Sequence, residues 1–395
     1  MSPDSHAHSG DAMRVRLLPQ ALTLSAFAIG LDTFVVIGAL HEMAKDLAVS
    51  PATAGRLVSI SAFCYAAFAP FNAWWFRSWP PQRVLLLSLV CFIAGNGLSA
   101  LSPTFNVLIA GRVVSAYGAA MFTPTATTLA AQRMPSGRKG VALALIFGGM
   151  TMSQALGVPL TTWISHALNW RWAFYCVVFF GLVALALLFI LLEHRASRPD
   201  PTTLCVTQKS RRFPPAIWGL FCVTLLVVTS EFIVYAYISV ILANTRLGDM
   251  PVLPLVLMAY GIGSVIGNIA TGLLTDRCGP ASVLSSVIVL QTAGLIALVL
   301  LRESAVAALA IGAGWGIVSY MYLVPIQHRL LGLAGAASQQ VLALNSSVIY
   351  IGIGVGSGMG GVIISQSGVS MLALIAGVIG ILALIPTGVV MRKPP

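Results

Sequence analysis

Charged residues are scarce in this sequence. They make up 8% of its 395 residues, and Asp and Glu contribute only 11 of them against 22 Lys and Arg. A soluble globular domain usually carries about 25% charged residues, so the composition excludes an ordinary soluble fold. The 6 cysteines lie in apolar stretches or basic loops, without the spacing of a zinc site. We therefore expect no disulfide, no metal site and no other cofactor.

Apolar residues, in contrast, form 58% of the chain, and the mean hydropathy is +0.92. Several stretches are long and apolar enough to cross a bilayer core of roughly 30 Å. The twelve stretches are residues 17–40, 53–75, 84–101, 105–131, 141–164, 172–192, 217–242, 253–274, 282–301, 305–326, 341–364 and 371–390. We predict an all-α membrane protein with one transmembrane helix in each stretch.

The basic residues indicate which side of the membrane each loop faces. Besides Arg112, which lies inside the fourth span, 16 Lys and Arg fall in the termini, the central loop and alternate short loops, and 5 fall on the opposite side. Cytoplasmic loops carry the excess of Lys and Arg, so we expect cytoplasmic termini and a multi-pass protein of the inner membrane. Because these residues alternate with the loops and form no single patch, the net charge of +11 does not indicate nucleic acid.

The first span carries one acid, Asp32, and the fourth span carries Arg112. Both lie about 10 to 12 Å from the outer ends of their spans, so we expect them to meet. An ionised side chain at that depth is costly unless it faces protein or water, which makes both residues candidates for function. Two interpretations remain open: a structural ion pair that locks the two helices, and a switch whose strength changes when Asp32 takes up a proton.

The second part of the chain repeats these features. Glu231 is the acid of spans seven to twelve and follows Asp32 by 199 residues. This offset predicts two pseudo-symmetric six-helix halves, with both acids facing one central cavity. Tyr235 lies one helical turn after Glu231 and Tyr237 is nearby, so both are either substrate contacts or core residues. The expected domains are a tail at 1–16, halves at 17–192 and 214–391, a cytoplasmic linker at 193–213 and a tail at 392–395.

Two further motifs provide candidate gating residues, one with a glycine and a proline inside a span and one with an acid and a base at the end of a span. Gly157 and Pro159 in the fifth span permit close helix approach and a bend, which serves either packing or a gating hinge. Asp276 and Arg277 lie between glycines at the cytoplasmic end of the eighth span, and Arg77 has the same register 200 residues earlier. We expect Asp276 and Arg277 to tie this helix end to its neighbours in one state of a cycle.

These motifs resemble those of a known family. The pattern Gly272-x-Leu274-x-Asp276-Arg277-x-Gly279 is similar to the signature of the major facilitator superfamily, and Arg112 with Gly118 resembles its fourth-helix motif. The run Gly157-Val158-Pro159-Leu160 resembles the helix-five motif of the twelve-span drug:proton antiporters, especially the arabinose-efflux-permease-like branch. The resemblance covers nearly the whole chain and implies the major facilitator fold.

With the buried charges, the resemblance implies a proton-coupled exporter of a small organic molecule, such as a drug, sugar or metabolite, that works by alternating access. A proton-coupled importer of a small metabolite is the alternative within transport, and a non-transporting membrane receptor is the alternative outside it. No enzyme is expected, since no His pair, Ser/Lys dyad or zinc spacing occurs inside the spans. The expected partners are the substrate, protons and membrane lipid, and the chain is expected to be a monomer.

The candidate residues fall into three groups by expected role. Proton coupling is assigned to Asp32, Glu231 and Arg112. Substrate binding is assigned to Asp32, Phe34, Tyr235, Tyr237 and Asn345. Gating is assigned to Asp276, Arg277, Gly157 and Pro159.

Overall fold

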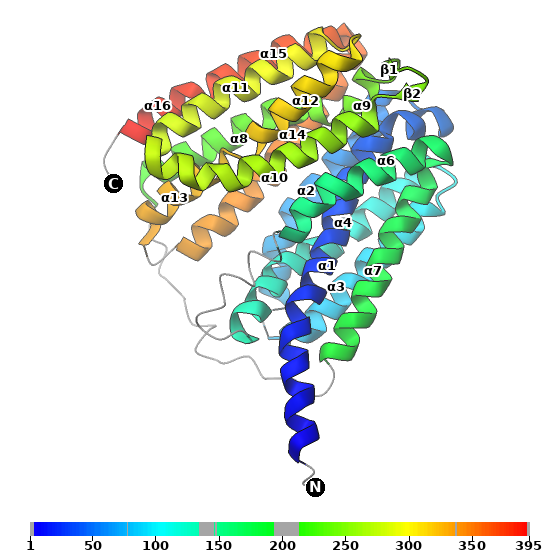
Figure 1. The fold of residues 1–395 in the computed structure, drawn as a ribbon, viewed down its shortest axis with the longest axis vertical. Coiled ribbons are helices and arrows are strands. Elements are labelled where there is room, and N and C mark those ends of the chain that lie inside the picture. The colour runs from blue at the N-terminus through cyan, green and yellow to red at the C-terminus, as the bar shows by residue number, and fades with distance from the viewer. Residues whose placement is uncertain are drawn as a thin grey trace. The chain divides into compact units, whose positions relative to one another are not determined.

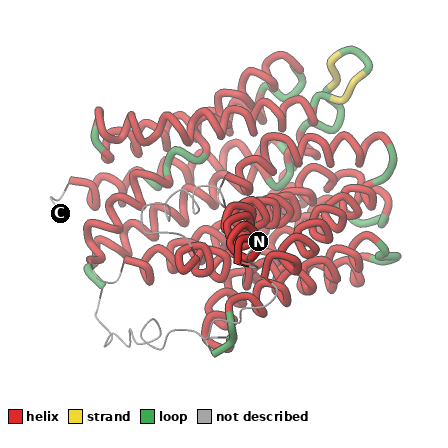
Figure 2. Tube along the Cα trace, turned by 60° about the horizontal axis from the view of Figure 1, so that its bottom comes forward, coloured by secondary structure: helices red, strands yellow, loops and turns green. Residues whose placement is uncertain are grey.

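The computed structural model describes residues 4–76, 78–133, 146, 148–192, 213–335 and 338–392. Helices dominate these residues, as Figure 1 shows, and a single hairpin of two short strands interrupts them (Figure 2). Inside a bilayer no water satisfies the backbone, and a helix satisfies its own N–H and C=O groups within one segment. The predicted all-α membrane protein is therefore confirmed.

The first part of the chain contains long helices with short connections. Their bounds are α1 Asp4–Asp46, α2 Pro51–Trp75, α3 Pro81–Ala100, α4 Phe105–Arg133, η2 Ser153–Gly157, α6 Val158–Ala167 and α7 Trp170–Leu192. The element η2 is a π-helix. The predicted fifth span, 141–164, lies partly outside the described residues, and its described part contains η2 and most of α6.

The second part of the chain follows the same pattern with more interruptions. Its elements are α8 Pro215–Tyr235, α9 Ile238–Ile241, β1 Arg246–Leu247, β2 Met250–Pro251, α10 Leu253–Cys278, α11 Pro280–Leu300, α12 Ala305–Ser319, α13 Leu323–Ala334, α14 Ser338–Ser367, α15 Ser370–Leu382 and α16 Leu384–Arg392. The strands β1 and β2 are antiparallel. Within the described part of the chain, 11 helical segments are long and apolar enough to cross a membrane.

Three predicted spans are not single helices, which corrects the sequence-based expectation. The tenth is broken between α12 and α13 around Met321, and the twelfth between α15 and α16 at Ala383. Pro325 and Pro386 account for these two breaks, because a proline has no N–H to donate to the carbonyl four residues earlier. Those carbonyls belong to Met321, at the first break, and Leu382, next to the second. The seventh span is broken between α8 and α9, where the N–H of Tyr237 bonds the Val234 carbonyl at 3.1 Å.

By its contacts the chain forms two compact units. The first comprises Met1–Thr33, Ala67–Ser153 and Arg171–Gln208, and the second comprises Phe34–Ala66, Gln154–Trp170 and Lys209–Pro395. The division into halves at 193–213 stays a prediction, because residues 193–212 lie outside the described part of the chain. Arg77 and most of the C-terminal tail lie outside it as well.

In the first unit, α3 and α4 pack with their backbones in contact. A Cβ atom placed on Gly95 would lie 2.7 Å from the carbonyl oxygen of Gly111, and one on Gly118 would lie 2.6 Å from the backbone nitrogen of Phe92. Small residues allow this approach, which supplies van der Waals packing where lipid offers no hydrophobic drive. The contact fixes α4, and hence Arg112, against α3.

In the second unit, the glycines of α14 pack against α8. A Cβ on Gly356 would lie 2.6 Å from the Thr229 carbonyl oxygen, and one on Gly360 would lie 2.7 Å from that of Ile233. Both carbonyls flank Glu231 in the sequence. This close packing of α14 holds the backbone around Glu231 in place.

Candidate functional site

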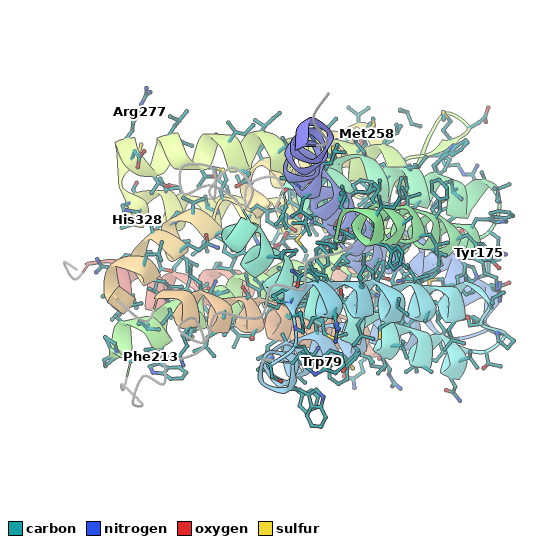
Figure 3. All side chains as sticks on the ribbon, turned by 90° about the horizontal axis from the view of Figure 1, so that it is seen from below. Trp79, Tyr175, Phe213, Met258, Arg277 and His328 are labelled. Carbon is teal, nitrogen blue, oxygen red and sulfur yellow. The ribbon has the colours of Figure 1, made fainter. Side chains whose placement is uncertain are left out.

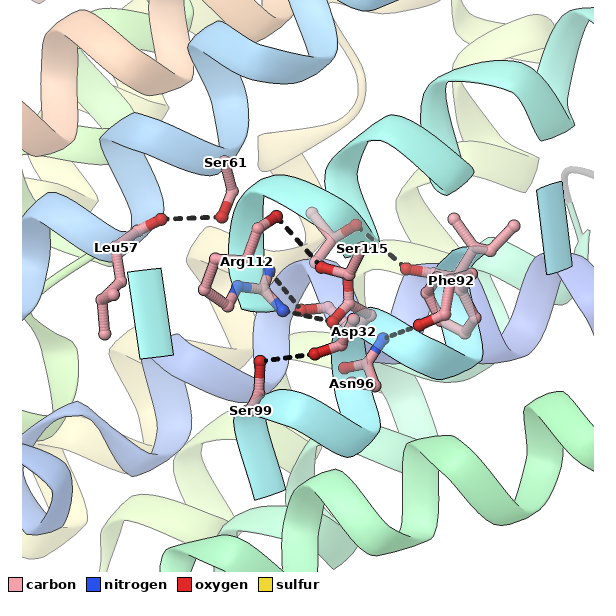
Figure 4. A network of polar contacts seen from close by, with 11 residues as sticks. Asp32, Leu57, Ser61, Phe92, Asn96, Ser99, Arg112 and Ser115 are labelled. Atoms are coloured by element: carbon pink, nitrogen blue, oxygen red, sulfur yellow. Dashed lines mark hydrogen bonds and ion pairs between the residues drawn. The ribbon is translucent and has the colours of Figure 1, made fainter. Parts of the chain in front are cut away.

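Asp32 of α1 and Arg112 of α4 form a buried ion pair in the first unit (Figure 4). The Nη1 atom of Arg112 donates to Oδ1 of Asp32, and its Nη2 atom donates to the backbone carbonyl of Asp32 at 3.3 Å. The guanidinium also lies over the ring of Phe174, 5.9 Å from its centre. The two charges that the sequence predicted to meet are thus in contact.

The surroundings of this pair are polar groups that bond their own helices. The hydroxyl of Ser115 donates to the Arg112 carbonyl at 3.1 Å, and the amide of Asn96 donates to the Phe92 carbonyl at 3.0 Å (Figure 4). With both charges paired and hydrogen-bonded, the cost of their burial is offset locally. The geometry permits a structural lock and equally a pair that responds to the charge on Asp32.

Glu231 lies on α8 in the second unit, with 4% of the residue exposed. The hydroxyl of Tyr260 on α10 donates to its Oε1 atom at 3.1 Å. Among the described residues, no Lys or Arg forms an ion pair with Glu231. The two membrane acids therefore differ in kind, because Asp32 has a cation beside it and Glu231 has a tyrosine hydroxyl.

Aromatic rings from three helices form a cluster that reaches Glu231 through Tyr260. Tyr235 and Tyr260 are stacked with ring centres 5.0 Å apart, and the ring of Trp315 on α12 lies 4.7 Å from Tyr260 and 5.3 Å from Tyr235. The ring of Phe34 on α1 lies 6.0 Å from that of Tyr235. The buried Nε1 atom of Trp315 has no hydrogen-bond partner within the described part of the chain. Two of the predicted substrate contacts, Phe34 and Tyr235, thus lie together.

Glycines set the positions of the rings on α10 and α12. A Cβ on Gly316 would collide with the carbonyl oxygen of Tyr260, and one on Gly263 would lie 2.5 Å from the Ala313 carbonyl oxygen. The two backbones therefore touch at the level of Tyr260 and Trp315. This contact brings the two rings within reach of α8 without long or flexible side chains.

The π-helix η2 connects the fifth span to this cluster within the second unit. Gln154 of η2 donates a hydrogen bond from Nε2 to the hydroxyl of Tyr320, just after α12. Gly261 of α10 allows the approach, since a Cβ there would lie 2.6 Å from the Gln154 carbonyl oxygen. Gly157 ends η2, and Pro159 stands in the first turn of α6. Single π-turns inside helices frequently mark functional sites.

Two other predicted substrate residues are engaged in bonds between helices. The hydroxyl of Tyr237 donates to the Ser357 carbonyl of α14 at 2.8 Å. Asn345 of α14 accepts a hydrogen bond from the hydroxyl of Thr224 on α8 at 2.9 Å. Both residues are buried and hold α14 beside the segment that carries Glu231. Their contacts are those of packing residues, and a contact with substrate stays a prediction.

The predicted gating residues Asp276 and Arg277 lie in the last turn of α10 and are exposed. Figure 3 shows Arg277 extending away from the end of the helix. Neither residue has a hydrogen bond or ion pair with another described residue. A role in tying helix ends together stays a prediction for another state of the protein.

Sequence reasoning missed four residues of the cluster at Glu231: Tyr260, Trp315, Tyr320 and Gln154. They lie in three apolar stretches, with Trp315 and Tyr320 in the same one, and an aromatic or amide side chain in such a stretch is usually an ordinary core residue. Trp315 is flanked by Gly314 and Gly316. Small residues beside a large ring indicate a close helix contact, so this pair is a signal in the sequence that could have pointed to Trp315. Which ring it meets depends on how the helices cross.

The membrane-spanning helices and their buried charged groups define a multi-pass membrane transport protein. The comparison with known families makes this assignment specific. Residues 22–339 match the model of the Major Facilitator Superfamily, and the chain belongs to this superfamily. Its members are transporters of small molecules and not enzymes, as the sequence predicted.

Relatives of similar length support the assignment. The chain is 30% identical over 376 residues to the uncharacterized MFS-type transporter YtbD of Bacillus subtilis (strain 168), with 93% of each chain covered. It is 26% identical over 387 residues to the inner membrane transport protein YdhP of Escherichia coli O157:H7, with 97% of this chain and 98% of that one covered.

Solved structures show the same fold at low sequence identity. A bacterial homologue of the human lysosomal transporter Spinster, in an inward-facing and unoccupied conformation, superposes with a TM-score of 0.74 at 17% identity, covering 97% of this chain and 99% of that one. The peptide transporter POT gives a TM-score of 0.75 at 12% identity, with 95% of each chain covered. The major facilitator fold expected from the sequence is confirmed.

Proposed function

We propose that this protein uses the proton gradient to export a small organic molecule from the cell by alternating access. The observation that carries the proposal is the presence of two buried acids in apolar helices with opposite surroundings. Asp32 is paired with Arg112, whereas Glu231 is bonded by Tyr260 and has no described cationic partner. Intramembrane acids of this kind are typical of proton relays in pumps and transporters.

Asp32 and Arg112 serve in this proposal as the proton-sensitive pair. A proton on Asp32 removes the charge attraction across the pair, while the bond from Arg112 to the backbone carbonyl does not depend on that charge. The pair therefore weakens without losing its register. Because the contact has two strengths, protonation of Asp32 can favour one arrangement of the helices over another.

Glu231 and its neighbours serve as the substrate site, together with Phe34 and Tyr235. Tyr237 and Asn345 support the same region from α14. We propose that two six-helix halves rock around this midplane region, as in other transporters built from repeats. Gly157 and Pro159, next to the π-turn η2, supply the bend, and Asp276 with Arg277 closes the cytoplasmic end of α10 in the outward-facing state.

The proposed location is the inner membrane, with both termini in the cytoplasm and the chain acting as a monomer. The excess of Lys and Arg in the terminal and alternate loops supports this orientation. The relative YdhP is an inner membrane transport protein, which supports the same location.

The test uses purified protein in sealed proteoliposomes that contain a pH-sensitive dye, under an imposed pH gradient. A panel of small molecules is added, and proton movement that depends on both protein and compound is the expected result. Uptake of the compound against its own gradient, in exchange for protons, supports export. Uptake in the same direction as protons supports the importer instead, and compound binding without any proton or compound movement contradicts transport.

A further inference from the structure

We propose that the second unit binds an organic cation, with the carboxylate of Glu231 as counter-ion and the rings of Tyr235, Tyr260 and Trp315 as the wall of the site. This inference rests on the proposed function, because it names the substrate class of the same region. The residues come from three helices, α8, α10 and α12.

The first argument is the charge of Glu231. The residue is almost fully buried, and its described hydrogen bond comes from a neutral hydroxyl. A buried carboxylate without a cation is costly, so a partner of positive charge is required whenever the group is ionised. Since the described protein supplies no such partner, a proton or a bound cation must supply it.

The second argument is the nature of the wall. The face of an aromatic ring carries negative electrostatic potential, and Trp and Tyr attract cations within about 6 Å of the ring centre, most strongly when water is excluded. Tyr235 and Tyr260 lie nearly parallel at 29°, and Trp315 stands at 84° to Tyr235. A cluster of rings at different angles, one of them bonded to the carboxylate, suits a bulky cation with apolar substituents better than a flat neutral molecule.

The same contacts disfavour other classes of substrate. An anion placed beside Glu231 would be repelled, and no described Lys or Arg pairs with this site to hold it. A neutral sugar would leave an ionised Glu231 without compensation. The unpaired N–H of Trp315 adds one donor, which favours a cation that also carries a hydrogen-bond acceptor.

Binding a cation at this carboxyl releases its proton. The reaction is the exchange of one proton on the Glu231 carboxyl for one cation beside the carboxylate, so charge is conserved in the site. Proton and substrate thus compete for a single group. This competition would give one-for-one exchange without any further acid in the second unit.

In this structure Glu231 is buried, and so are Tyr235, Tyr260 and Trp315. Entry of a cation therefore requires movement of the contacts that close the site. Gln154 and Tyr320 form one such contact, because their hydrogen bond joins η2 to the end of α12. We expect a bound cation to separate these two side chains.

The test measures binding to the purified full-length protein in detergent. The probes are tetraphenylphosphonium and tetraphenylborate, which have the same shape and opposite charge. We expect tetraphenylphosphonium to bind, with higher affinity as the pH is raised and with release of about one proton per cation in weak buffer. Glu231→Gln should weaken binding about tenfold or more, and Trp315→Leu about threefold to thirtyfold.

The chain offers a matched control for each change. Glu303 is an exposed acid, and Trp218 of α8 is 60% exposed, so Glu303→Gln and Trp218→Leu should leave binding unchanged. Equal binding of tetraphenylborate, or unchanged binding in Glu231→Gln, overturns the inference. If Glu231→Gln fails to fold, the wild-type protein decides, because pH-independent binding without proton release overturns it as well.

The inference and the proposed function fail in different ways. Proton movement driven by a neutral pentose, L-arabinose, with no binding of tetraphenylphosphonium, would overturn the inference and leave the proposed function standing. Binding of tetraphenylphosphonium with proton release, but without proton movement in sealed proteoliposomes, would support the cation site and contradict proton-coupled transport.

Discussion

Arg112 bonds Asp32 at two places, the carboxylate and the backbone carbonyl, although the two residues are 80 positions apart in the sequence. One bond depends on the charge of Asp32 and the other does not. The contact between α1 and α4 thus has a part that a proton can remove and a part that it leaves in place.

Changing Asp32 to Asn removes the carboxylate charge and keeps the shape of the side chain and the backbone bond to Arg112. We expect Asp32→Asn to lose nearly all accumulation driven by a pH gradient, while the protein still folds and still binds its substrate. The measurement is uptake into proteoliposomes with and without the gradient. Asp249→Asn, a change in the exposed β1–β2 turn, serves as the control. Wild-type accumulation in Asp32→Asn would leave Glu231 as the proton carrier.

Changing Arg112 to Met leaves the Asp32 carboxylate buried without its cation. Breaking a buried pair in this way costs about 3 to 5 kcal/mol of stability. We expect Arg112→Met to lower the thermal unfolding midpoint strongly in detergent, and the added change Asp32→Asn to recover part of the loss by removing the charge. Arg246→Met, on the exposed strand β1, should have little effect. A double variant as unstable as Arg112→Met alone would show that charge is not the cause.

Changing Asp276 to Asn tests the C-terminal end of α10. If this acid ties the helix end to its neighbours in the outward-facing state, Asp276→Asn should favour the inward-facing state by about 1 to 3 kcal/mol. Cysteine labelling at positions exposed in only one state measures the shift. The same variant should fold normally, because Asp276 is exposed and has no described partner. An unchanged labelling pattern would count against the role.

Two glycines of α3 provide a paired test of helix packing. A Cβ on Gly95 would lie 2.7 Å from the Gly111 carbonyl oxygen, whereas a Cβ on Gly97 would meet no atom within 4 Å. We expect Gly95→Ala to destabilise the protein by about 1 to 3 kcal/mol through overpacking. Gly97→Ala should be neutral or stabilising by up to about 1 kcal/mol, since alanine favours the helix. Thermal unfolding of both variants in one detergent makes the comparison.

The sequence predicted the helices well because membrane spans depend on length and hydropathy alone. It also predicted that Asp32 and Arg112 meet, because depth in a straight helix follows from residue number. It did not predict the breaks near Met321 and Ala383, although Pro325 and Pro386 were visible, because many membrane helices tolerate a proline. Each break depends on whether neighbouring helices satisfy the freed carbonyl.

The site around Glu231 was predicted only in part, for a related reason. Tyr235 was found because it shares a helix with the acid, so helical periodicity places it nearby. Tyr260 and Trp315 come from other helices, and their meeting depends on how closely Gly316 lets α12 approach α10. A single sequence shows the glycine, but it does not show how the two helices cross at that glycine.

Tyr237 illustrates how narrow the choice of residues becomes at such a crossing. Its hydroxyl bonds the Ser357 carbonyl, and it lies where a Cβ on either Gly55 or Gly361 would stand. A saturation library at those two positions should therefore return almost only glycine, while the exposed neighbour Arg56 should accept many residues. Larger residues at 55 or 361 would survive only beside a smaller residue at 237, so the three positions are expected to drift together through evolution.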